Sequence, residues 1–142
     1  MAGEISGIEE LSYTVDTGSS TGVTARRFVK PTAETTVDQC DTEGEWALGV
    51  AKTPVSLSNT QGLDEVTAGK GVAVQVHGVA WVEASEAIAI GVEVGVGSDG
   101  TAITADSGDY VAGRCLKATS DVTVNLLVLV QLSGGTGYVK PA

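Results

Sequence analysis

The chain has 142 residues, with 18 acidic and 8 basic side chains, and its formal net charge is −10 at neutral pH. Proteins that bind nucleic acid gain much of their affinity from cations on phosphates, and anionic membranes attract cationic segments, so this charge argues against both partners. Hydrophobic residues make up 42% of the chain but aromatic residues only 4%, which predicts one core of small aliphatic side chains.

The first 23 residues mix acidic residues with Ser, Thr and Gly and show little apolar periodicity. We therefore expect residues 1–23 to form an extended N-terminal arm that only a partner orders. Within this arm Leu11, Tyr13 and Val15 alternate with polar residues, so the segment could dock as an added strand with its apolar side down. These three residues are the predicted partner-binding site.

A β-rich domain is predicted over residues 24–132, and the glycine-rich residues 133–142 are expected to form a flexible tail. The candidate strands lie at 24–31, 34–39, 46–51, 72–82, 92–96, 101–104, 111–116 and 122–132. Gly78 interrupts the clearest alternation, which predicts a bulge or bend at that glycine. No window predicts a convincing helix. Short strands separated by turns at intervals of roughly ten residues predict an all-β fold, a compact small β-sandwich or barrel.

No motif of the chain predicts catalysis. Residues 95–100 match GxGxxG, but a dinucleotide fingerprint opens a helix and here a strand follows, so we expect a hairpin. His77 is expected to face solvent or an interface. Cys40 and Cys115 are expected to be small buried residues, and their spacing leaves a disulfide open. The acids over 38–45 lack the spacing of a calcium loop, which favours a solvated loop over a weak cation site between subunits.

The sequence therefore predicts no catalytic residue, no cofactor and no metal site, and we do not expect an enzyme. The N-terminus lacks the basic start and apolar run of a signal peptide. The longest apolar run, over residues 126–130, is far shorter than the roughly 20 residues that a membrane-spanning helix needs. Nothing in these features directs the chain to a membrane or out of the cell, and synthesis in the cytoplasm is the corresponding expectation.

Several glycine- and valine-rich segments follow one another in an order typical of one family. They lie at 25–31, 48–51, 71–76, 78–82, 87–94, 99–101, 111–118 and 122–132. In this order the chain resembles the small capsid decoration, or cement, proteins of tailed bacteriophages, a group long catalogued as a phage domain of unknown function. The resemblance covers residues 24–132.

This resemblance implies a β-tulip-like fold and homotrimers that bind the major capsid protein on the exterior of the virion and stabilise the shell. It carries over no catalytic residues. Two other classes stay open: another phage structural subunit, of a tail or fibre, and a small carbohydrate- or ligand-binding β domain. In the last class Trp46, Trp81 and the tyrosines would line a platform. The aromatic residues are few and dispersed, which favours packing of both tryptophans in the core.

Overall fold

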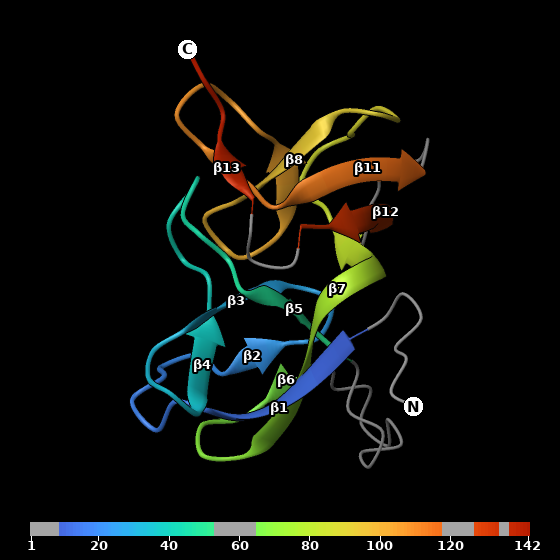
Figure 1. Ribbon diagram of the computed structural model, residues 1–142. Helices are drawn as coiled ribbons and strands as arrows, with labels where there is room; N and C mark the ends of the chain where they lie inside the picture. Colours follow the sequence, from blue (N-terminus) through green and yellow to red (C-terminus); the bar gives the residue numbers. More distant parts are fainter. Residues whose placement is uncertain (1–8, 53–64, 118–126, 134–136) are drawn as a thin grey trace.

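The computed structural model describes residues 9–52, 65–117, 127–133 and 137–142 (Figure 1). The strands within these ranges are β1 (Glu9–Val15), β2 (Val23–Thr24), β3 (Phe28–Pro31), β4 (Thr36–Gln39), β5 (Gly49–Ala51), β6 (Glu65–Val66), β7 (Gly71–Glu83), β8 (Glu93–Val96), β9 (Ala102–Thr104), β10 (Tyr110–Val111), β11 (Gly113–Lys117), β12 (Leu127–Leu132) and β13 (Tyr138–Val139). No helix occurs in the described part, and hence none that could cross a membrane. The all-β prediction is confirmed.

Five strands form a closed barrel in the lower half of Figure 1. They follow one another as β1, β4, β3, β5 and β7, and a further pairing of β1 with β7 closes the circle. The β1–β4 pair is parallel, and the other pairs of the barrel are antiparallel. Closure removes the free sheet edges that would otherwise invite pairing with another chain. The predicted compact barrel is thus confirmed.

The long strand β7 belongs to two parts of the sheet. Its first half pairs with β1 up to His77, and its second half pairs with β12 from Gly78 onward. Gly78 has a φ of 92°, a value that glycine adopts with little strain, so the irregularity predicted at this residue is present. Beyond β12 the sheet continues through β11, β8 and β9, which form the upper half of Figure 1.

The hairpin predicted over residues 95–100 joins β8 to β9. These strands pair antiparallel, and the amide of Gly97 donates to the carbonyl of Thr101 across the turn at 2.7 Å. A strand therefore follows the GxGxxG match, as predicted, and the match has no dinucleotide context. The last strand was predicted over residues 122–132. Residues 122–126 lie outside the described residues, and β12 begins at Leu127.

Buried side chains form two clusters where the sequence predicted one core. The cluster inside the barrel consists of Val15, Val23, Val29, Val37, Ala51, Val66, Val72, Val74 and Val76. The upper cluster contains Phe28, the bulkiest fully buried side chain, and is otherwise mostly aliphatic. Two clusters arise because the two halves of β7 pack against different sets of strands.

Both chain ends are more integrated than expected. Residues 9–15 form β1 of the barrel in the chain itself, so the prediction that a partner must order this segment is wrong; residues 1–8 lie outside the described residues. The alternating apolar side chains of residues 9–15 belong to a strand that pairs with β7 of the same chain. Near the C-terminus β13 pairs with β10, and the amide of Lys140 donates to the carbonyl of Asp109 at 2.8 Å. This part of the predicted flexible tail is ordered by its backbone hydrogen bonds.

Candidate functional site

The outer face of β7, β12 and β11 exposes apolar side chains beside basic ones. Ala80, Val82, Val128 and Val130 point into the upper core, and side chains alternate along a strand. The residues between them therefore face outward. We call this face the outer platform; it consists of Val79, Trp81, Leu127, Leu129, Gln131, Arg114 and Lys117.

Strand register arranges the outer platform in rows. Trp81 lies opposite Leu129, which lies opposite Lys117 on the next strand. Val79 lies opposite Gln131, which lies opposite Arg114. Cross-strand neighbours of this kind touch one another, so each row is one contact surface. The platform thus combines an apolar centre with cations along its β11 edge.

Neither tryptophan is buried in the core, and this prediction is wrong. Trp81 is 43% exposed because it lies on the side of β7 opposite to Ala80 and Val82. Trp46 is 41% exposed and packs edge-on against Tyr110, with ring centroids 6.4 Å apart. The hollow that Trp81 lines does not include Trp46. The two rings do not share that hollow.

Among the described residues, cations outnumber acids along the β11 edge of the platform. Lys117 is exposed and forms no salt bridge with a described residue. Arg114 donates to the carbonyl of Gly91 at 2.8 Å and lies opposite Glu93. The hydrogen bond from the Tyr138 hydroxyl, Lys140 at 3.4 Å and the charge of Arg114 together hold the pKa of Glu93 below its usual value. The carboxylate of Glu93 therefore interacts with two cations, Lys140 and Arg114.

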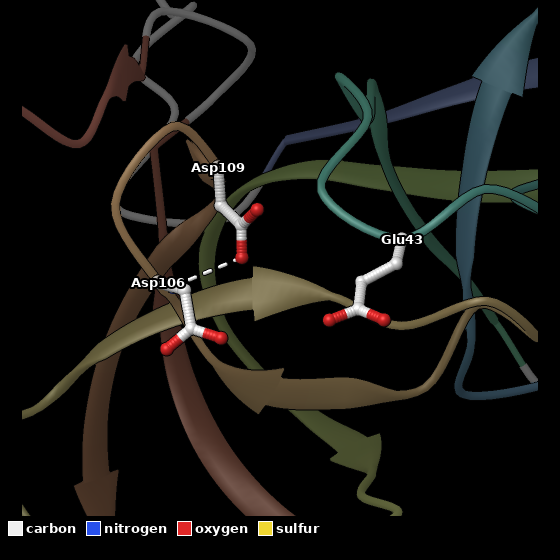
Figure 2. Close-up of side chains that lie close together, drawn as sticks. All are labelled: Glu43, Asp106 and Asp109. Atoms are coloured by element: carbon white, nitrogen blue, oxygen red, sulfur yellow. Dashed lines mark hydrogen bonds between the residues drawn. The ribbon is translucent and has the colours of Figure 1, made fainter.

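Three carboxylates meet near the β9–β10 turn, as Figure 2 shows. Glu43 reaches them from the loop before β5, and Asp106 and Asp109 come from the turn itself; one oxygen of each lies within 4.8 Å of the others. The carboxylate of Asp109 also accepts from the amide of Asp106 at 2.9 Å. Backbone bonds hold the loop against the turn, since Gly44 accepts from the amide of Tyr110 at 3.1 Å.

Gly44 is needed where these two segments approach each other. Its φ is 81°, and a Cβ there would overlap the carboxylate of Asp109. The three oxygens are the ligand type that hard cations such as Ca²⁺ prefer, but Ca²⁺ takes roughly six to eight of them. The sequence assigned Glu43 to a solvated loop and gave no sign of Asp106 beside it. The absence of a metal stays a prediction.

The carboxylates of Glu43 and Asp106 also border a broader concavity. This acidic hollow has a volume of about 400 Å³ and is lined by Glu43, Ser85, Glu86, Gly97, Ser98, Asp99, Ile103, Thr104 and Asp106. Four of these residues are acids, and the described lining contains no Lys or Arg. Glu86 accepts from the amide of Thr104 at 2.8 Å, which holds its carboxylate in place. The negative charge of the hollow is therefore complementary to that of a basic group.

Asp99 is the most firmly held carboxylate of the acidic hollow. Its partial burial raises its pKa, but the hydroxyl of Thr101 at 2.6 Å, the amide of Thr101 at 3.3 Å and the charge of Arg27 together outweigh this effect. The pKa of Asp99 consequently lies below its usual value of 3.8, and its charge persists at neutral pH.

The three predicted partner-binding residues lie on β1 of the barrel. Val15 is fully buried in the barrel core, and Tyr13 packs half-buried against the same cluster. Leu11, opposite Val74, is 40% exposed. Val15 offers no surface to a partner, and contact of Leu11 or Tyr13 with the capsid stays a prediction.

His77 and the two cysteines lie as the sequence indicated. His77 is exposed on β7, opposite Glu9. Cys40 and Cys115 are both buried free thiols, so the disulfide left open by the sequence is not formed. Burial raises the pKa of both thiols, which keeps them protonated and unreactive at neutral pH.

Comparison with known proteins gives a likeness of structure only. No protein-family model matches the sequence, and no curated protein matches it. A crystal structure of the head fiber gp8.5 N base in bacteriophage phi29 superposes with a TM-score of 0.60. The fold is similar to that of this phage fiber base. The match covers 89% of this chain and 97% of that chain at 20% sequence identity, which establishes the fold alone.

Proposed function

We propose that this chain is a structural protein of a bacteriophage virion, seated on the outer surface of the head as a homotrimer. In this role it binds the major capsid protein and stabilises the shell. The observation that carries the proposal is the likeness of fold to a phage head fiber base over nearly the whole of both chains. The order of the glycine- and valine-rich segments led to an expectation of the same location.

The architecture suits a load-bearing surface protein. Small side chains that branch at Cβ fill most of the barrel core, and such side chains have few rotamers, so the core is stiff. Closure of the barrel leaves it without free edges, and the outer platform offers an apolar contact surface with cations along its β11 edge. A polar rim around an apolar centre is the usual composition of a protein–protein interface.

Among the alternatives to a decoration protein, the structural match favours the base of a head fibre over a tail subunit. A head decoration protein and the base of a head fibre both sit on the shell, but only the base continues into a projecting fibre. A tail subunit would share the composition and not the location. A carbohydrate-binding domain has less support, because the hollow beside Trp81 is not lined by Trp46, which packs against Tyr110 instead.

The location of the chain in virions tests the proposal. Phage particles from cells that carry the gene are purified on density gradients and labelled with gold-conjugated antibody against the full chain. We expect the label on heads, and we expect particles from a deletion strain to release their DNA at a lower temperature until the gene is restored. Label on tails alone would support the tail alternative, and absence of the chain from particles would overturn the proposal.

A further inference from the structure

We propose that the outer platform of one copy docks into the acidic hollow of a second copy, so that three copies close head-to-tail into a ring. The inference rests on the proposed function, because it names the surfaces that hold the homotrimer together. Both surfaces belong to this chain, and their charges are complementary.

The platform supplies the basic partner. Its apolar rows around Trp81 and Leu129 end at Lys117, whose ammonium group has no salt-bridge partner among the described residues. Arg114 shares the carboxylate of Glu93 with Lys140. Burial of the apolar centre against a partner lowers the free energy of the complex. The adjacent cations favour binding only where the partner's surface is acidic.

The acidic hollow supplies the other half of the contact. Its four carboxylates stand around a concave surface, and Ile103 adds an apolar side chain to the lining. Glu43 and Asp106 are exposed, and neither forms a salt bridge with another residue in the described part of the chain. A lysine or arginine from a neighbouring copy would relieve the repulsion among these carboxylates.

The number of copies decides the symmetry of the contact. In a two-fold dimer each platform could meet the hollow of the other copy, so the contact would be made twice. Three equivalent copies cannot pair in this reciprocal way, so in a trimer each copy offers its platform to one neighbour and its hollow to the other. Such contacts form closed rings when the rotation between copies closes, and three copies match the trimer of the proposed function.

Charge reversal and charge exchange test the contact. We compare the platform-reversed variant Arg114→Glu/Lys117→Glu, the hollow-reversed variant Glu43→Lys/Asp106→Lys and the chain that carries all four substitutions. Sedimentation velocity over a concentration series gives the association state. We expect the wild type to form trimers, each reversed variant to associate at least about 30-fold more weakly, and the fourfold exchange to restore trimers.

The control is Lys70→Glu, since Lys70 is also exposed but lies in the turn before β7. Lys117→Glu changes the net charge equally and should weaken association, while Lys70→Glu should not. Circular dichroism and thermal unfolding confirm that every variant folds. A wild type that stays monomeric, equal effects of Lys117→Glu and Lys70→Glu, or a folded exchange variant that stays monomeric would each overturn the inference.

These outcomes are separate from those of the proposed function. A chain that labels phage heads but stays monomeric alone refutes the head-to-tail contact and leaves the virion location intact. A trimer that the charge exchange restores, but that is absent from particles, refutes the location and leaves the contact intact.

Discussion

Val15 tests whether β1 is part of the folded domain or an arm that waits for a partner. The substitution Val15→Thr keeps the shape of the side chain and places a hydroxyl among the aliphatic side chains of the barrel core, where Val15 is fully buried. A buried hydroxyl without a partner costs about 2 kcal/mol. For a domain of this length that loss lowers Tm by about 6 °C.

The control makes the same chemical change at an exposed site. Val139 is 63% exposed on β13, so Val139→Thr should shift Tm by no more than about 1.5 °C. Thermal unfolding of the two purified variants, followed by circular dichroism, measures both shifts. If Val15→Thr melted with the wild type, β1 would be undocked in the free protein, and the barrel closure described above would be wrong.

Two further predictions follow from single contacts. Gly113→Ala would push a Cβ into the backbone oxygen of Gln131, so we expect the free energy of unfolding, measured in urea, to fall by about 3 kcal/mol. The control Gly71→Ala should lower it by less than about 1 kcal/mol, because the nearest atom to the added Cβ lies at 3.9 Å. Equal losses would contradict the close approach of β11 and β12. The pKa of Asp99 is lowered in the folded state, so its charge stabilises the fold above its usual pKa of 3.8, and this contribution disappears as pH falls through the folded-state pKa. The Tm difference between wild type and Asp99→Asn should therefore shrink from about pH 6 to about pH 3, and a constant difference would refute the lowered pKa of Asp99.

Local patterns in the sequence predicted most of the longer strands, because alternation of side chains along a strand needs no knowledge of distant residues. The two-residue strands β6 and β13 were not among the predicted ones. β7 and the hairpin over residues 95–100 were found from local patterns. The destination of β1 was not, because the alternation of Leu11, Tyr13 and Val15 fits a strand in the chain's own barrel as well as one in a partner's sheet. Only the long-range pairing with β7 distinguishes the two.

The candidate site was less accessible from sequence. The outward alternation of Val79 and Trp81 was visible, but composition led to the prediction of a buried tryptophan. The acidic hollow joins the loop at Glu43 to residues near 85, 98 and 106, and no spacing along the chain announces such a meeting. Its charge pattern appears only when backbone bonds such as that between Gly44 and Tyr110 bring the segments together.

Because β7 contributes side chains to both buried clusters, neither half of the protein can be inherited or engineered as a separate module. A recombination boundary anywhere between Gly71 and Glu83 would leave each fragment with an unpaired strand and an open core. New sequence is better accommodated at surface turns such as residues 97–101, where an insertion leaves the shared strand continuous. Diversification of this fold should therefore take place at the tips of its hairpins, while the central strand keeps its length.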